Sequence, residues 1–186
     1  MSSSSASGYL EIILGPMFSG KTTKILDIYK QCKFCNIPVS IINHSSDTRY
    51  NDTMLSSHDQ LFAPCVQTVL LSDAWKKNVG IRSSDVILIN EGQFFTDLYA
   101  VVHDMLKHKK KVYICGLDGD FERKKFGQIL DLIPMCDKVT KLTSLCSKCK
   151  DGTSAIFSMR LTCETDQTVV GSSNYIPICR KCYDNR

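Results

Sequence analysis

The chain has 186 residues, with 23 Lys and Arg against 19 Asp and Glu, a formal net charge of +4, and ten cysteines. This length predicts one full domain with a small appendage, and so mild a charge gives no support to nucleic-acid or membrane binding. A hydrophobic content of 43% excludes disorder of the whole chain. Residues 1–8 are serine-rich and expected to be a disordered tail, and the lack of a secretory signal predicts a cytoplasmic protein.

Apolar runs alternate with segments of helical periodicity over the first two thirds of the chain. Helices are expected from Thr22 and from Leu98 to Leu106, because apolar side chains recur there on one helical face. The polar residues 44–60 are expected to form a long functional loop. Alternation of strands and helices predicts an α/β fold, a parallel sheet with helices on both faces. The predicted strands are 9–14, 38–43, 85–90 and 111–116.

The first predicted strand runs into a phosphate-binding pattern, G-x-x-x-x-G-K-[ST], and a helix follows it. Glycines let the backbone wrap a phosphate, and the helix N-terminus favours its negative charge. Lys21 is expected to reach the β- and γ-phosphates, and the Thr22 hydroxyl to coordinate Mg²⁺. The pattern therefore predicts a RecA-like P-loop that binds a nucleoside triphosphate. Its residues are Gly15, Pro16, Met17, Phe18, Ser19, Gly20, Lys21 and Thr22.

A second part of the nucleotide site is expected where the predicted strand 85–90 ends. Asn90 stands where P-loop proteins usually carry an Asp near Mg²⁺, so it can orient a metal-bound water but brings no charge. Glu91 is the leading candidate for the catalytic acid/base, because parallel sheets place active sites at the carboxyl ends of strands; a surface glutamate capping the next helix is the alternative. Asp47 could supply the missing charge and Arg49 could contact phosphate, or both could be ordinary loop residues.

Four of the ten cysteines form two C-x-x-C pairs near the C-terminus. Without a secretory signal, metal binding or burial is preferred to a disulfide framework. Two such pairs complete a tetrahedral Zn²⁺ site with no open position for water, which indicates a structural metal. We therefore expect a P-loop domain at 9–141 and a small zinc-ribbon or lasso domain at 142–186. A third pair, Cys32 and Cys35, is expected to pack rather than to act in redox chemistry. The predicted zinc ligands are Cys146, Cys149, Cys179 and Cys182.

Several further motifs occur in a fixed order with the P-loop and the cysteine pairs. Together they resemble the type II thymidine kinases, the cytosolic and large-DNA-virus family, over about residues 9–183. The resemblance implies phosphorylation of thymidine, and of deoxyuridine, by ATP at the 5′-OH, with Glu91 as general base. The further motifs are Asp47-Thr-Arg-Tyr50, Ser57-His-Asp59, Glu91-Gly-Gln-Phe-Phe95 and Gly116-Leu-Asp-Gly-Asp-Phe121.

The same resemblance implies where the two substrates bind. Besides the P-loop, the residues around Mg²⁺ and the ATP phosphates would be Asp47, Thr48, Arg49, Asn90, Gly92 and Gln93. The nucleoside would be enclosed by Leu117, Phe121, Phe126, Ser158 and Tyr175, and by the lasso segment Gln167, Thr168, Val169, Val170 and Gly171.

The resemblance also implies properties beyond the site, and the chain departs from the family pattern twice. A homotetramer, inhibition by the end product dTTP and a cytoplasmic location (the host's, for a viral protein) are implied. Asn90 replaces the usual Asp, and Gly171-Ser172-Ser173 replaces two adjacent glycines of the lasso.

Two other functions remain open at this point. A P-loop ATPase that binds single-stranded nucleic acid through a zinc ribbon is favoured by the Lys and Arg beside the cysteine pairs, although the small net charge weighs against it. A non-catalytic nucleotide sensor is suggested only by Asn90.

Overall fold

A six-stranded, all-parallel sheet forms the centre of the molecule in the computed structural model, which describes residues 7–47, 54–56, 62–169 and 171–185. The strands lie in the order β5-β2-β6-β7-β1-β8, so the chain starts next to one edge, crosses to β2 and β5 at the far side, fills the middle with β6 and β7, and ends at the edge strand β8. Their bounds are β1 (Tyr9–Leu14), β2 (Val39–His44), β5 (Val66–Thr68), β6 (Val86–Asn90), β7 (Lys111–Gly116) and β8 (Lys138–Lys141).

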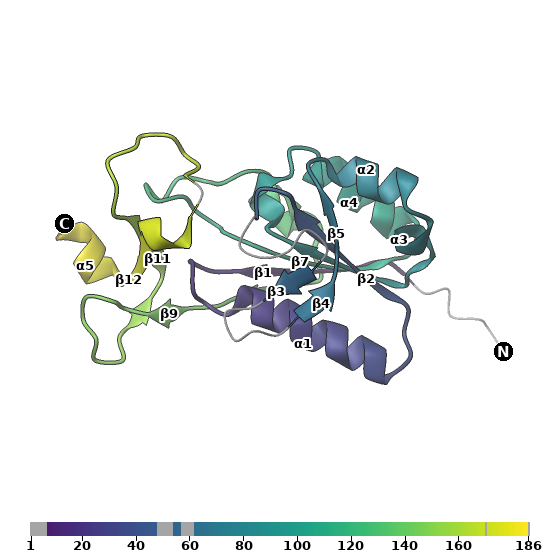
Figure 1. Cartoon of the computed structure of the whole chain (residues 1–186), viewed down its shortest axis with the longest axis horizontal. Helices are drawn as coiled ribbons and strands as arrows, with labels where there is room; N and C mark the ends of the chain where they lie inside the picture. Colours follow the sequence, from purple (N-terminus) through teal and green to yellow (C-terminus); the bar gives the residue numbers. More distant parts are fainter. Residues whose placement is uncertain (1–6, 48–53, 57–61, 170, 186) are drawn as a thin grey trace.

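Helices cover both faces of this sheet (Figure 1). One face is covered by α1 (Lys21–Phe34), and the other by α2 (Leu71–Lys77), α3 (Val79–Ser83) and α4 (Leu98–Lys107). Because side chains alternate along a strand, Ile13 packs with α1 while its neighbour Ile12 packs with the opposite helices. Both faces are therefore apolar, as parallel sheets require. This confirms the predicted α/β fold with helices on both faces.

The predicted strands and both predicted helices are present, but the expectation of a strandless loop at 44–60 is wrong. Within it, β3 (Met54–Ser56) pairs antiparallel with β4 (Phe62–Pro64). Leu55 and Ala63 of this hairpin are buried in the cluster that contains α1. The pairing partner lies beyond the polar stretch, so no pattern inside the stretch could reveal it. Residues 48–53 and 57–61 lie outside the described structure.

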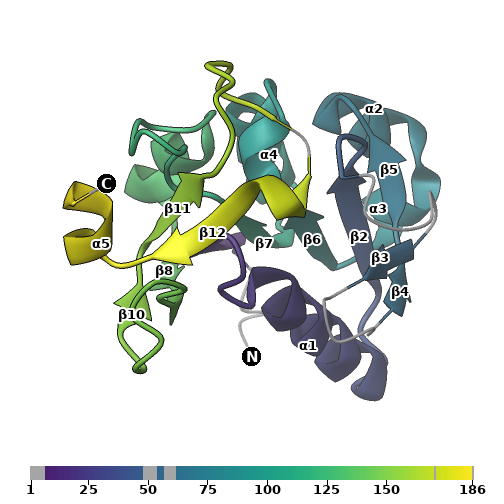
Figure 2. The ribbon, with the colours of Figure 1, turned by 60° about the vertical axis from the view of Figure 1, so that its left-hand side comes forward.

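The C-terminal region forms a smaller body at the carboxyl ends of the central strands (Figures 1 and 2). It contains two antiparallel pairs, β9 (Ser144–Leu145) with β10 (Ser154–Ala155), and β11 (Phe157–Arg160) with β12 (Tyr175–Ile178). The helix α5 (Arg180–Asp184) follows the second pair. The small core of this C-terminal region includes Cys146 and Cys179. Short 3-10 helices are η1 (Gly92–Phe94), η2 (Ile129–Met135) and η3 (Ser172–Asn174).

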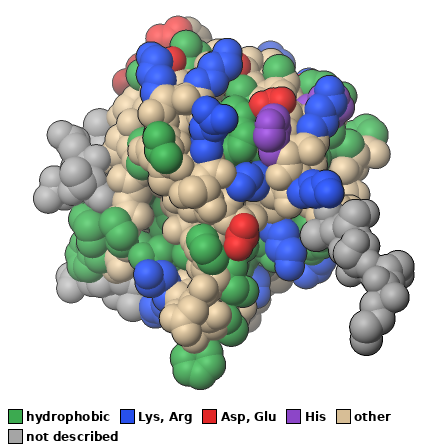
Figure 3. Space-filling view, turned by 90° about the vertical axis from the view of Figure 1, so that its right-hand side faces the viewer, with side chains coloured by type: hydrophobic (Ala, Val, Ile, Leu, Met, Phe, Trp, Pro, Cys, Tyr) green, Lys and Arg blue, Asp and Glu red, His purple; other side chains and the backbone are tan. Residues whose placement is uncertain are grey.

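The surface on the side away from this C-terminal region is mixed. Lys and Arg side chains are spread across that face among polar and apolar groups rather than gathered in one stripe (Figure 3). Within the described parts of the chain, no helix combines the length and the apolar character needed to cross a membrane.

Candidate active site

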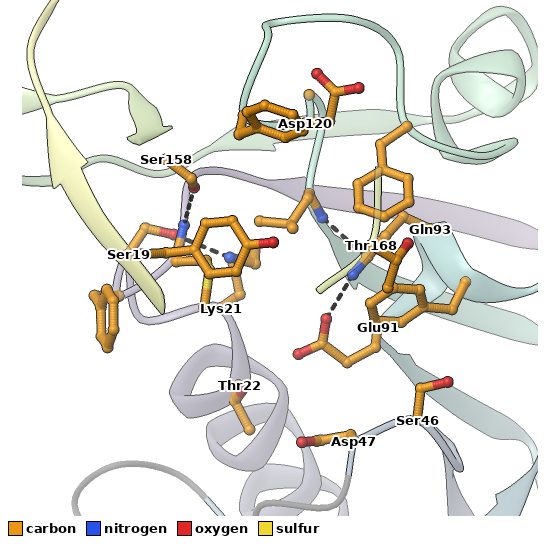
Figure 4. Close-up of a pocket in the computed structure, with 18 of the residues that line it drawn as sticks. Ser19, Lys21, Thr22, Ser46, Asp47, Glu91, Gln93, Asp120, Ser158 and Thr168 are labelled. Atoms are coloured by element: carbon orange, nitrogen blue, oxygen red, sulfur yellow. Dashed lines mark hydrogen bonds between the residues drawn. The ribbon is translucent and has the colours of Figure 1, made fainter. Parts of the chain in front are cut away.

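A cavity of about 400 Å³ lies between the carboxyl ends of the sheet and the C-terminal region (Figure 4). It joins the end of the P-loop and the start of α1 to segments that follow β2, β6 and β7, and to β11 and β12. One cavity thus reaches from a phosphate-binding loop to the cysteine-rich region. The predicted site residues that line it are Met17, Phe18, Ser19, Gly20, Lys21, Thr22, Asp47, Glu91, Gln93, Leu117, Phe121, Phe126, Ser158, Gln167, Thr168, Val169, Gly171 and Tyr175.

The P-loop connects β1 to α1, and part of its backbone has a conformation that favours glycine. Gly20 has a φ of 81°, in the left-handed region where a Cβ is disfavoured. The Lys21 ammonium donates to the Pro16 carbonyl at 2.7 Å, so its charge lies within the loop. The Met17 N–H donates to the Ser158 hydroxyl of β11 at 2.9 Å (Figure 4). The C-terminal region therefore helps to fix the phosphate-binding loop.

A chain of buried amides connects the P-loop helix to the segment after β2. The Asn90 side-chain amide donates to the side-chain oxygen Oδ1 of Asn43 at 2.8 Å, across paired positions of β6 and β2. The Asn43 amide then donates to Asp47, at 3.3 Å, while the Thr22 hydroxyl and the Cys115 thiol donate to the Asn90 oxygen, at 3.5 and 2.9 Å.

A carboxylate can only accept hydrogen bonds, so Asp47 accepts from the Asn43 amide. This fixes the donor in the next two bonds, which run from Asn90 to Asn43 and from Thr22 to Asn90. Because the Thr22 hydrogen is donated to Asn90, the lone pairs of its oxygen are left for another partner. Thr22 and Asp47 therefore offer oxygen ligands of the kind that Mg²⁺ prefers, and Asn90 orients the Thr22 hydroxyl.

Glu91 sits in a strained turn directly after β6. Its φ of 54° and ψ of 43° are left-handed, which costs a non-glycine residue about 1–2 kcal/mol. The Gln93 amide donates to the Glu91 carboxylate at 2.7 Å, and the Gln93 oxygen accepts from the Leu117 N–H at 3.0 Å. Gly116 makes this possible, since a Cβ there would lie 2.4 Å from the Gln93 oxygen. The fold therefore holds the Glu91 carboxylate in the cavity.

The segment that carries Asp47 is anchored by a buried histidine. The Ser46 N–H donates to Nδ1 of His44 at 3.1 Å, and the ring packs edge-on against Phe95. Burial lowers the pKa of His44, which keeps the ring neutral and able to accept. Beside this segment, burial and the charge of Asp47 raise the pKa of the Cys65 thiol to about 11, so Cys65 is not a thiolate at neutral pH.

Aromatic rings and hydrogen-bonded lasso residues form the other end of the cavity. Phe126, 7% exposed, packs edge-on against Phe94 with ring centroids 5.5 Å apart. The Gln167 amide donates to the Asp120 carboxylate at 2.7 Å, and the Tyr175 hydroxyl donates to the Val169 carbonyl at 3.2 Å. An apolar slot bordered by backbone groups fits a planar base with a polar edge.

The four predicted zinc ligands form one cluster. Their sulfur atoms all lie within 4.8 Å of one another, and Cys149 is 3.4 Å from Cys182. Tetrahedral Zn–S bonds place sulfur atoms about 3.8 Å apart, so the residues fit a Zn²⁺ ion. Burial opposes ionisation of Cys146, but backbone N–H groups of Cys149, Cys179 and Lys148 lower its pKa to about 6. Within the third pair, Cys32 is buried in the core while Cys35 is exposed.

A family model described as thymidine kinase matches residues 8–183. This chain belongs to the thymidine kinase family. It is 39% identical to the thymidine kinase of sheeppox virus over 95% of this chain and 97% of that protein. It is 40% identical to thymidine kinase a of Arabidopsis thaliana, over 95% of this chain and 75% of the relative. Its identity to the cytosolic thymidine kinase of Gallus gallus is 35%, over 95% and 77% of the two chains.

In this member of the thymidine kinase family, the cavity wall does not include four of the predicted residues that the structure describes. Gly15, Pro16, Asn90 and Gly92 lie behind it, and Gly92 packs against Ile114, which a Cβ would approach to 2.6 Å. Thr48, Arg49 and Val170 lie outside the described residues.

Sequence reasoning missed six lining residues of this thymidine kinase family site. Three of them lie within the quoted motifs and the other three directly beside one, so nearness to a motif was the available signal. The missed residues are Thr23, Ser46, Ser56, Phe94, Gly119 and Asp120.

Proposed function

We propose that this protein transfers the γ-phosphoryl group of ATP to the 5′-OH of thymidine, giving dTMP and ADP, and that deoxyuridine is a second acceptor. The main support for this proposal is the position of Glu91. Its carboxylate lies in one cavity between the P-loop and the aromatic slot, held by Gln93. Membership of the thymidine kinase family supports the same reaction.

The P-loop side would bind the phosphates of ATP. Backbone N–H groups of residues 15–22 and the start of α1 attract negative charge, and Lys21 would exchange its bond to Pro16 for phosphate oxygens. Thr22 and Asp47 would hold Mg²⁺, with Asn90 orienting Thr22. When bound, Mg²⁺ neutralises the charge that develops on the phosphate oxygens. Asn90 brings no charge, so Asp47 would supply the carboxylate.

The other end of the cavity would hold the nucleoside. Leu117, Phe121 and Phe126 would enclose the thymine ring, and backbone groups of 167–169 would read its edge. The 5′-OH would then face Glu91, whose carboxylate accepts the hydroxyl proton. As this oxygen bonds to the γ-phosphorus, the bond from that phosphorus to the β–γ bridging oxygen breaks and ADP leaves. The lasso would exclude water, which limits ATP hydrolysis.

We also propose the finer properties that the family implies. The four clustered cysteines would bind one structural Zn²⁺ per chain, and the chain would divide into a P-loop domain at 9–141 and a zinc domain at 142–186. A homotetramer, a cytoplasmic location and inhibition by dTTP are proposed from the resemblance alone. Size-exclusion chromatography with light scattering tests the homotetramer, and dTTP inhibition curves test the inhibition by dTTP.

A nucleoside screen with product identification tests the proposed reaction. Zinc-loaded protein is incubated with ATP, Mg²⁺ and each of thymidine, deoxyuridine, deoxycytidine and deoxyadenosine, and products are identified by mass spectrometry. We expect dTMP and dUMP, with little product from the purine nucleoside. The absence of any phosphorylated pyrimidine nucleoside, from protein shown to bind ATP, would reject the proposal.

A further inference from the structure

Arg160 is a buried cation at the end of β11 that the sequence did not mark as functional. Its side chain is embedded between the lasso and β12, and the residue is only 8% exposed. Burying a guanidinium away from water is costly unless every N–H finds an acceptor. The groups that accept hydrogen bonds from Arg160 therefore show which parts of the structure its side chain holds in place.

All five N–H donors of a guanidinium are accounted for here. Two donate to backbone carbonyls of Glu164, at 2.8 Å, and Asp166, and a third donates to the carbonyl of Gln167, at 3.0 Å. The other two donate to the Tyr175 hydroxyl, at 2.7 and 3.2 Å. One side chain thus fixes three carbonyls of residues 164–167, the stretch that leads into the lasso, and one aromatic residue of β12.

The flat face of the same guanidinium lies over the ring of Phe121, with 3.7 Å from Cζ to the ring centroid. Phe121 follows β7 in the P-loop part of the chain and lines the cavity. From the other side, the Tyr175 hydroxyl, bound to Arg160, also bonds both backbone groups of Val169. Arg160 therefore connects two walls of the cavity, the lasso and the loop after β7.

No shorter or differently shaped side chain can make this set of contacts. Lysine has three donors on a tetrahedral ammonium and lacks a planar face, whereas arginine presents five donors in a fixed fork. Glutamine has two donors and no charge. If the lasso left its place, the buried Arg160 cation would lose the carbonyls that accept its hydrogen bonds. The closed lasso is consequently the stable arrangement while Arg160 is present.

We infer that Arg160 is a positioning residue, which holds the lasso and Phe121 closed around the nucleoside and so determines nucleoside affinity rather than nucleotide affinity. Arg160 touches neither the P-loop nor Glu91 among its described contacts. This inference rests on the proposed function for the identity of the acceptor, thymidine. Its structural part, the clamp on residues 164–169, stands without it.

The test compares Arg160→Gln and Arg160→Lys with a matched control, Arg123→Gln. Arg123 also lies over aromatic rings in this region, 4.3 Å from the Tyr183 centroid, but it is partly exposed and does not line the cavity. For each variant we would measure zinc content, deuterium exchange of the peptide spanning 161–169, the dissociation constants of thymidine and Mg·ATP, and the KM and kcat for thymidine.

For Arg160→Gln we expect faster exchange at 161–169 but not in α4, and thymidine binding weakened about 10- to 100-fold. Mg·ATP binding should change less than about threefold, KM should rise more than kcat falls, and Arg160→Lys should restore only part of the affinity. Arg123→Gln should stay within about twofold of the unchanged protein. Unchanged exchange at 161–169, or faster exchange with unchanged thymidine affinity, overturns the inference.

A second variant keeps the test decisive if Arg160→Gln fails to fold or to retain zinc. Tyr175→Phe removes only the hydroxyl that joins Arg160 to Val169, and it should weaken thymidine binding several-fold; no change would overturn the inference. A wild-type protein that binds no thymidine would instead reject the proposed function, while the exchange data would still report on the clamp.

Discussion

The two halves of the cavity are built by different means. The P-loop side rests on a sheet buried on both faces, whose core includes fully buried side chains such as Ile12 and Leu98. The C-terminal side has a core of six buried residues, two of them cysteines of the proposed zinc site, and otherwise relies on hydrogen bonds of Arg160 and Tyr175. Burial alone can maintain the first half, whereas the second is too small to fold without cross-links.

Because of this difference, we expect each half to lose its structure and its ligand binding independently of the other. Loss of apolar packing should remove nucleotide binding, and loss of thiol ligands or of the clamp should remove nucleoside binding. Contacts such as Met17 with Ser158 and Gln167 with Asp120 are the points at which one half can affect the other. The following predictions test this division, from the largest expected effect to the smallest.

Replacing one cysteine of the proposed zinc site should disorder the C-terminal half and leave the P-loop half folded. Metal binding contributes on the order of 10 kcal/mol to small zinc domains, so Cys146→Ser should disorder the C-terminal region and abolish thymidine phosphorylation. The only tryptophan, Trp75, lies buried in α2 and reports on the P-loop half. Its fluorescence and its urea transition should persist.

The matched control for this experiment comes from the third C-x-x-C pair. Cys35 is exposed at the end of α1, so Cys35→Ser should retain about one Zn²⁺ per chain and full activity. Full activity in zinc-free Cys146→Ser protein would show that the metal does not maintain the acceptor side.

Replacing the proposed general base should stop phosphoryl transfer while leaving both halves folded. Glu91→Gln keeps the shape of the side chain but cannot accept the 5′-OH proton, so kcat should fall about 10²- to 10⁴-fold. The dissociation constants of Mg·ATP and thymidine should stay within a few-fold. Single-turnover kinetics and calorimetry measure the two quantities.

Glu122→Gln provides the control for Glu91. Glu122 pairs with Lys124 on the surface and does not line the cavity, so its replacement should leave kcat unchanged. A Glu91→Gln enzyme with a normal kcat would remove Glu91 from the proposed mechanism.

Lowering the pH should weaken the P-loop half through His44. Because burial lowers the pKa of His44 in the folded state, the unfolded chain binds a proton first as the pH falls below about 6.5. Stability should therefore be lost as the pH falls below that value, by at most about 1.4 kcal/mol per pH unit. His44→Gln, which stays neutral, should lose less in urea titrations followed by Trp75 between pH 7 and pH 5.5.

An exposed histidine controls for the general effect of pH. His103 lies on the exposed side of α4, so His103→Gln should follow the unchanged protein at every pH. Identical pH profiles for His44→Gln and the unchanged protein would rule out a contribution from His44.

Most of the fold could be predicted from the sequence because its signals are local. Tyr9–Leu14 and Val86–Asn90 are short apolar runs, and α4 repeats its apolar residues at helical spacing. The strands β5 and β8 were missed because both are short edge strands, and β8 is largely polar. The helix α2 was missed because seven residues are too few to establish a period.

The sequence by itself determined the motifs whose residues are consecutive or regularly spaced: the P-loop, Glu91 after its strand, and the two cysteine pairs. Only the tertiary structure decided which distant side chains meet. Asn43 and Asn90 are 47 positions apart, and Arg160 stands between Met159 and Leu161 with no motif around it. A buried polar side chain is defined by partners from other elements, so its role can be read only after the chain has folded around it.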